Sequence, residues 1–198
     1  MCYNKGDGTE KNLEKSFYWF QKAAENGIIS SQFNLAQLYY DGEGTEKNLK
    51  KAFYWYQKAA ENGHIYAQYN LVSLYYNGEE TEKNLEKAFY WYLKAAENGQ
   101  IDAQSSLASL YFIGEGIEKN LEKSFYWFQK AAINGRVNAQ YNLALLYYLG
   151  EGTEKNLTRA FYWYQKAAKN GQTNSQYNLA ICYANGEGTE RNLEKVFY

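Results

Sequence analysis

Apolar residues recur along the chain with helical spacing, in two sets within every 36 residues. In the period from Tyr66 to Ile101 the first set follows one face of a helix, at Ala67, Leu71, Leu74 and Tyr75. The second set forms one stripe of a later segment, at Leu85, Ala88, Phe89, Tyr92, Ala95 and Ala96. Charged residues occupy the other side of that segment. The pattern predicts two amphipathic helices per period, called helix A and helix B.

Glycine and asparagine columns mark the ends of these helices. Gly78 and Gly99 are placed to end helix A and helix B, because glycine adopts the left-handed conformation without a Cβ penalty. Helix B is predicted to follow an asparagine N-cap, in the column Asn12, Asn48, Asn84, Asn120, Asn156 and Asn192. Helix A is predicted to follow a second polar column, from which Tyr66 departs: Ser30, Asp102, Asn138 and Asn174.

The five tryptophans show that the unit is repeated, since each lies 36 residues from the next: Trp19, Trp55, Trp91, Trp127 and Trp163. A fixed period of this length is typical of stacked helix pairs. We expect an all-α fold, a right-handed α-α superhelix (solenoid) of 36-residue helix-turn-helix repeats. Residues 1–198 are interpreted as a single repeat array, with five full repeats and partial repeats at both ends, belonging to a longer chain.

The two ends of this array are predicted to be under-packed, because no polar capping helix covers their apolar faces. We expect fraying or end-to-end self-association there, at Cys2, Tyr3, Leu193, Val196 and Phe197. One internal position also breaks the pattern, since Glu80 stands in a column that otherwise holds glycine. We predict either a positive φ at Glu80 or a path of the 78–84 loop that differs from its counterparts.

The repeated sequence resembles a known family. Read as Ala67, Leu71, Leu74-Tyr75, Gly78, Ala88, Trp91-Tyr92, Ala95-Ala96 and Gly99, it is similar to the Sel-one-like repeat (SLR) family, a relative of the shorter tetratricopeptide repeat. The resemblance covers the whole chain and implies adaptors and scaffolds that bind other proteins. Bacterial cysteine-rich members carry a disulfide in each repeat, and this chain lacks those cysteine pairs.

Composition narrows the choice of partner. The 21 basic and 22 acidic residues give a net charge of −1, which predicts no nucleic-acid partner. No apolar run is long enough for insertion into a membrane. Cys2 and Cys182 fall in a leucine column and are interpreted as core residues, without a disulfide framework. A reducing compartment, the cytoplasm, is the expectation, and the endoplasmic reticulum lumen is left open.

Candidate chemistry for an enzyme is absent from the sequence pattern. We predict no catalytic residue, no metal site and no cofactor. His64 is the single histidine, and it is interpreted as a surface residue of a tolerant turn. The Gly42-Glu43-Gly44 loop lacks the lysine and hydroxyl residue of a phosphate-binding loop and is interpreted as a turn.

One side of helix A is the candidate binding surface. Asparagines there could pair with the backbone of an extended peptide, while tyrosines supply rigid contact area. We assign the hypothetical concave-face site to Asn34, Tyr69, Asn70, Tyr141, Asn142, Leu145, Leu149, Tyr177, Asn178 and Ile181. The alternative is that these residues pack between neighbouring helices as structural ties.

The expected function is a non-enzymatic scaffold or adaptor that binds a protein or peptide through the concave face. The alternative is a regulatory repeat segment of a larger signalling enzyme, for example one that follows a protein kinase domain.

Overall fold

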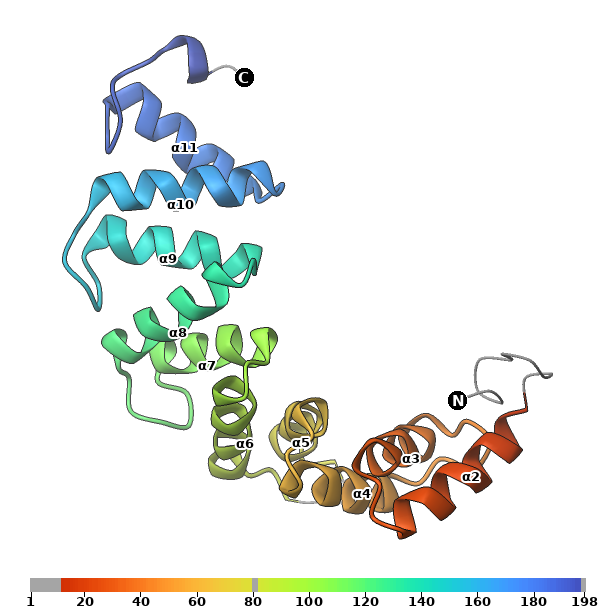
Figure 1. Cartoon of the computed structure of the whole chain (residues 1–198). Helices are drawn as coiled ribbons and strands as arrows, with labels where there is room; N and C mark the ends of the chain where they lie inside the picture. The colour runs from red at the N-terminus through yellow and green to blue at the C-terminus, as the bar shows by residue number, and fades with distance from the viewer. Residues whose placement is uncertain (1–11, 80–81, 197–198) are drawn as a thin grey trace. The chain divides into compact units, whose positions relative to one another are not determined.

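The chain folds into a succession of short helices of equal length (Figure 1). The computed structural model describes residues 12–79 and 82–196, and within these ranges it contains α-helices, one 3-10 turn and no strand. The helices B are α2 (Leu13–Glu25), α4 (Leu49–Glu61), α6 (Leu85–Glu97), α8 (Leu121–Ile133) and α10 (Leu157–Lys169). The helices A are α3 (Ile29–Asp41), α5 (Ile65–Asn77), α7 (Ile101–Ile113), α9 (Val137–Leu149) and α11 (Thr173–Asn185). The predicted all-α repeat class is confirmed.

The chain divides into two compact units at a boundary between repeats, Met1–Gln100 and Ile101–Tyr198. In the first unit α2, α3, α4 and α5 each pack against the helix that follows, up to α6. In the second unit α7, α8, α9 and α10 do the same, up to α11, and α11 packs against the 3-10 turn η1 (Glu194–Val196). Contacts between helices are therefore local along the chain within each unit, as a stack of hairpins requires.

The asparagine column begins every helix B, as predicted. The Asn12 side chain accepts a hydrogen bond from the Lys15 N–H at 2.9 Å, and Asn84 accepts one from Lys87 at 2.9 Å. Asn48, Asn120 and Asn156 repeat this contact. Each bond satisfies an N–H of the first turn that has no partner inside the helix.

Helix A begins two residues earlier than the sequence predicted. Ser30 and its column equivalents lie inside the first turn, and the N-cap positions are Ile28, His64, Arg136 and Gln172. The reason is the tight turn that ends helix B. The His64 N–H donates to the Ala59 carbonyl at 2.9 Å, so a single extended residue separates that turn from the next helix.

His64 is half-buried and structural, so its interpretation as a plain surface residue was wrong. Its Nδ1 accepts a hydrogen bond from the Ala67 N–H at 3.3 Å. Its ring stacks on Phe33, with 4.3 Å between centroids and 18° between planes. Burial lowers the pKa of His64 from its usual value. The side chain thus caps α5 and ties it to α3.

Glycines end the helices A in the left-handed conformation, with φ of 74° at Gly78 and 77° at Gly42. A second glycine follows two residues later and lets the loop approach the start of an earlier helix B. A Cβ at Gly44 would collide with the Leu13 carbonyl, and one at Gly188 with the Leu157 carbonyl. The predicted strain at Glu80 lies outside the described residues.

The core lies between the two helices of each hairpin and between hairpins of one unit. Leu35, Leu71, Leu107 and Leu143 are completely buried at one position of helix A. The alanine pairs of helix B are buried against them, which allows the helix backbones to approach closely. Cys182 occupies the leucine column and is buried, as predicted, and burial raises the pKa of its thiol to about 11.

At the C-terminal end, packing is weaker than inside the array. Leu193 is 52% exposed, and Val196 is partly exposed where Ala52, Ala88 and Ala160 are buried. These two residues agree with the predicted under-packing, while Cys2, Tyr3 and Phe197 lie outside the described residues.

Candidate functional site

The helices A carry the residues assigned from sequence to a binding site. Most of these side chains are half-buried: Asn34, Tyr69, Asn70, Tyr141, Asn142, Leu145, Asn178 and Ile181. Leu149 and Tyr177 are exposed, at 49% and 69%. We call this surface, within each unit, the helix-A face. Among the described residues, each unit has a surface hollow on this face.

The two hollows are built from the same seven positions of the repeat, 72 residues apart. The first lies between α3 and α5 and is lined by Gln37, Tyr40, Asp41, Tyr56, Asn70, Ser73 and Leu74. The second lies between α7 and α9 and is lined by Ser109, Phe112, Ile113, Phe128, Asn142, Leu145 and Leu146. Their volumes are similar, about 220 Å³ and 190 Å³. The backbone of the repeat therefore creates the hollow, and the local sequence sets its chemistry.

The α3–α5 hollow is polar. Its floor is Tyr56 of α4, which is 3% exposed, and burial raises the pKa of this phenol to about 12. The Asn70 side chain lies beside the Tyr56 hydroxyl and opposes that rise in pKa, while the nearby Asp41 carboxylate adds to it. Tyr40 forms one wall, and its hydroxyl donates to Glu79 at 3.4 Å. Burial and the Glu79 charge both raise the pKa of Tyr40.

The α7–α9 hollow is apolar because four substitutions converge on it. Relative to the first hollow, Phe112 replaces Tyr40 and Phe128 replaces Tyr56, which removes both hydroxyls. Ile113 replaces Asp41 and Leu145 replaces Ser73. Ile113 is 67% exposed at the rim. Asparagine is retained at the equivalent position, Asn142. The result is an apolar hollow with one carboxamide in its wall.

The asparagine column performs two different roles. Asn70 lies beside the hydroxyl of Tyr56, and Asn178 beside that of Tyr164, and each carboxamide counteracts the rise in the pKa of its tyrosine. These two act as ties to a helix B, which matches the structural alternative. Asn142 faces Phe128, which has no hydroxyl, and among the described residues its side chain has no hydrogen-bond partner. Asn142 is therefore free to pair with a ligand.

The aromatic column of helix A mostly packs between helices. Phe33 contacts Tyr56, Tyr69 contacts Tyr92 and Tyr141 contacts Tyr164, with 5.9–6.2 Å between ring centroids. These rings form the floor and sides of the helix-A face and leave only part of their edges in solvent. Their contribution to binding is therefore limited to those edges.

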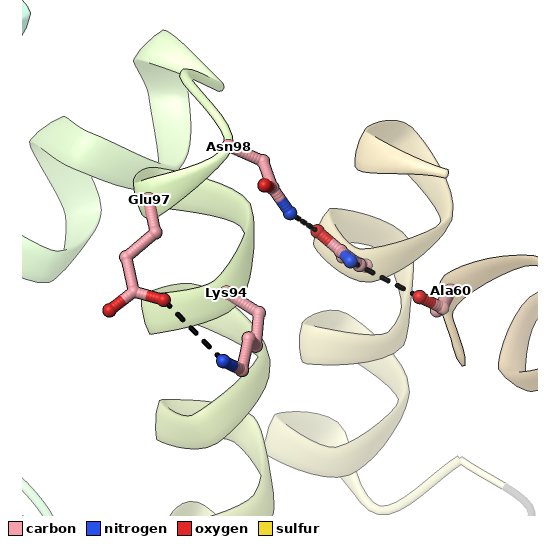
Figure 2. A network of polar contacts seen from close by, with 5 residues as sticks. Ala60, Lys94, Glu97 and Asn98 are labelled. Atoms are coloured by element: carbon pink, nitrogen blue, oxygen red, sulfur yellow. Dashed lines mark hydrogen bonds and ion pairs between the residues drawn. The ribbon is translucent and has the colours of Figure 1, made fainter. Parts of the chain in front are cut away.

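Sequence reasoning missed a glutamine column on helix A, which is buried in every helix A except α11. The Gln68 Nε2 donates to the Ala60 carbonyl at 3.1 Å, and the Gln68 Oε1 accepts from Asn98 at 3.0 Å. Figure 2 shows this chain of contacts running from Ala60 to Asn98, beside the Lys94–Glu97 ion pair. A polar residue at one position of every helix A, among buried leucines, was the signal in the sequence: Gln32, Gln68, Gln104, Gln140 and Gln176.

The described residues also bear on metal sites and membrane spans. No group of three or more histidine, cysteine, aspartate or glutamate side chains is arranged to hold a metal ion there. Within the same residues, no helix has the length and apolarity needed to cross a membrane.

Comparison with known proteins agrees with the helical architecture and defines a class of protein, the helical repeat proteins. The Sel1 repeat matches six times, over residues 1–28, 29–64, 65–100, 101–135, 137–172 and 173–195. The chain belongs to the Sel1 repeat family. Proteins with this repeat are generally protein-interaction scaffolds. No curated protein sequence matches the chain.

Solved structures show the same fold. A Sel1 repeat protein from Oxalobacter formigenes is 30% identical with a TM-score of 0.79, and the match covers 99% of this chain and 80% of that one. A protective antigen of uropathogenic Escherichia coli that displays an SLR fold is also 30% identical, with a TM-score of 0.63; the match covers 99% of this chain and 50% of that one. Cysteine-rich protein B of Helicobacter pylori is 28% identical, with a TM-score of 0.52, over 67% of this chain and 96% of that one.

Proposed function

We propose that this chain is a non-enzymatic scaffold that holds an extended segment of a partner protein on the helix-A face, with the α7–α9 hollow receiving one apolar side chain. The observation that carries the proposal is the convergence of Phe112, Ile113, Phe128 and Leu145 on one hollow. These four apolar residues are not needed for the core of a repeat. The first unit has the same hollow with Tyr40, Asp41, Tyr56 and Ser73 at the equivalent positions.

The size of the hollow favours a side chain over a whole small molecule. Its volume is about 190 Å³, and pockets for drug-sized ligands typically measure about 300–1,000 Å³. One leucine-like or aromatic side chain of a partner fits this scale. Burying such a side chain contributes roughly 1.5–3 kcal/mol, which is enough to anchor a peptide.

Asn142 supplies the polar part of the proposed contact. A carboxamide carries both donors and an acceptor, so it can pair with the N–H and C=O groups of one residue in an extended backbone. Because Asn142 has no side-chain partner among the described residues, no existing bond must break before it pairs. The apolar hollow and the amide beside it would together select an extended segment with an apolar residue.

Selection of peptides from a random displayed library tests this function. The chain is immobilised, and bound sequences are read for wild type, for Leu145→Asp and for Ile133→Asp. Ile133 is the matched control, because it is an isoleucine of the same unit, 64% exposed at the end of α8 and away from the hollow. We expect wild type and Ile133→Asp to enrich one apolar position, and Leu145→Asp to lose that enrichment. Equal enrichment by all three proteins would overturn the proposal.

The regulatory-segment alternative, with a kinase domain in the same chain, is supported by no contact or comparison and stays a hypothesis.

A further inference from the structure

The α3–α5 hollow has the chemistry of a site for a positive charge. Asp41 lies on its wall at the end of α3, exposed, and the described residues contain no ion pair to this carboxylate. Charged groups at an interface are commonly matched by opposite charges of the partner, so a ligand with a positive charge suits this wall. A second carboxylate, Glu79, accepts a hydrogen bond from the wall residue Tyr40.

Two tyrosine rings complete this hollow. The rings of Tyr40 and Tyr56 meet edge to face, with centroids 6.5 Å apart and an interplanar angle of 61°. Aromatic faces attract cations, and a planar guanidinium also stacks on them. The carboxamide of Gln37 adds a further acceptor to the lining. Arginine has five N–H donors in a rigid fork, which suits a wall with a carboxylate and a carboxamide.

The equivalent hollow in the second unit provides an internal comparison. Lys47 lies over the Tyr40 ring at 5.2 Å, and Lys119 lies over Phe112 at 5.5 Å, so the neighbouring lysine is common to both hollows. The two hollows differ in the side chains that would face a ligand. Asp41 becomes Ile113, and both tyrosines become phenylalanines. The negative charge is therefore specific to the α3–α5 hollow.

We infer that the α3–α5 hollow binds an arginine side chain of the partner protein, through the Asp41 carboxylate and the Tyr40 ring, above the buried floor of Tyr56. The inference rests on the proposed scaffold function, and it specifies the chemistry of the partner: a segment or segments that offer both a basic and an apolar residue. The binding should weaken as salt is added, because the Asp41 pair lies at the surface.

Nuclear magnetic resonance titration with three blocked tripeptides tests this inference. The probes are Ac-Gly-Arg-Gly-NH₂, its neutral citrulline isostere and Ac-Gly-Leu-Gly-NH₂, added to the whole chain. We expect the arginine probe to shift signals of Gln37, Asn70 and Ser73, and the citrulline probe to shift them at least threefold less at equal concentration. Asp41→Asn should weaken the arginine probe about three- to fivefold, the effect of one exposed charge pair. Glu43→Gln is the matched control, because Glu43 carries the same charge on an exposed residue outside the hollow.

The outcomes separate this inference from the scaffold function. Equal shifts from arginine and citrulline, or equal affinity of wild type and Asp41→Asn, overturn the arginine site. The leucine probe reports on Asn142 and Leu145 in the same spectra. Absence of its shifts there counts against the proposed function, whatever the arginine probe does at Asn70.

Discussion

Asn98 donates a hydrogen bond of 3.0 Å to Gln68, a residue of the preceding helix A that is 4% exposed. Gln68 in turn donates to the Ala60 carbonyl at the end of α4 (Figure 2). One buried side chain thus joins three consecutive helices of the first unit. Both the Nε2 and the Oε1 of Gln68 have hydrogen-bond partners. The side chain therefore fixes the packing of these helices and leaves no buried polar atom of its own unpaired.

Replacement of this glutamine by leucine is expected to destabilise the protein. Gln68→Leu keeps the volume similar but leaves the Ala60 carbonyl and Asn98 without their shared partner. We expect a loss of about 1–3 kcal/mol in the free energy of unfolding, measured by urea titration. Gln176→Leu is the matched control, since Gln176 is exposed and its bond to Ala168 is 3.4 Å. Equal losses in the two variants would contradict a special role for the buried tie.

The asparagines of helix A should differ in their contribution to stability. Asn178→Ala removes the carboxamide beside the hydroxyl of the buried Tyr164, so we expect it to cost about 1–3 kcal/mol of stability. Asn142→Ala removes a side chain with no partner among the described residues, so its cost should stay below about 0.5 kcal/mol. Thermal unfolding of the two variants checks the difference. A large loss for Asn142→Ala would mean that this asparagine is also a tie.

The predictive power of the sequence was greatest where each repeat obeys the same rule. The asparagine caps of helix B and Gly78 at the end of α5 follow from single-residue preferences, and the structure confirms them. Helix A starts earlier than expected because the backbone hydrogen bond from His64 to Ala59 sets that boundary. The types of residue in the turn do not reveal this bond. The polar column at Ser30 was a misleading signal for the same reason.

The candidate site was predictable in part. Helix A and Asn142 could be named from the repeat, since an asparagine ladder is visible in the sequence. Phe128 and Ile113 were missed, because the hollow joins α7, α8 and α9 and its lining is not a single face of one helix. The role of Asn70 depended on a hydroxyl of another helix, Tyr56, and no pattern within one helix reveals such a pair.

Stability should depend on pH through His64. Burial lowers the pKa of His64 in the folded protein, so the unfolded chain binds the proton more tightly. Stability is then complete above the ordinary histidine pKa of about 6.5 and decreases as the pH falls through that value toward the lower folded pKa. Protonation of His64 also removes the Nδ1 acceptor of the Ala67 N–H, which caps α5.

Substitution of His64 by glutamine isolates this effect. Gln172 occupies the same N-cap position in α11 and accepts the Ser175 N–H at 2.7 Å, so His64→Gln is expected to keep the cap. We expect the melting temperature of wild type to fall more than that of His64→Gln between pH 7.5 and pH 5.5. Parallel curves for the two proteins would show that other groups cause the pH dependence.

Replacement of Glu80 by glycine is expected to stabilise the chain. At the equivalent positions φ is 71° at Gly44 and 72° at Gly188, and a Cβ there would meet the carbonyl of an earlier helix B. A non-glycine residue in this conformation costs roughly 1–2 kcal/mol, and a change of loop path to avoid it also costs free energy, so Glu80→Gly should recover up to about that amount. Differential scanning calorimetry gives the test, with Glu43→Gly, at an exposed glutamate of the equivalent loop, as a control for lost charge and added flexibility. An unchanged melting temperature for Glu80→Gly would show that position 80 tolerates a side chain.

The affinity of one library-selected peptide for three proteins tests the scaffold account most directly. Isothermal titration compares wild type, Leu145→Asp and Ile133→Asp, with circular dichroism to confirm that all three are folded. Burial of the apolar side chain contributes about 1.5–3 kcal/mol to binding, so its loss corresponds to a roughly tenfold to hundredfold higher dissociation constant. The account predicts that loss for Leu145→Asp and no change for Ile133→Asp. An unchanged dissociation constant for folded Leu145→Asp would contradict it, because the α7–α9 hollow would then take no part in binding.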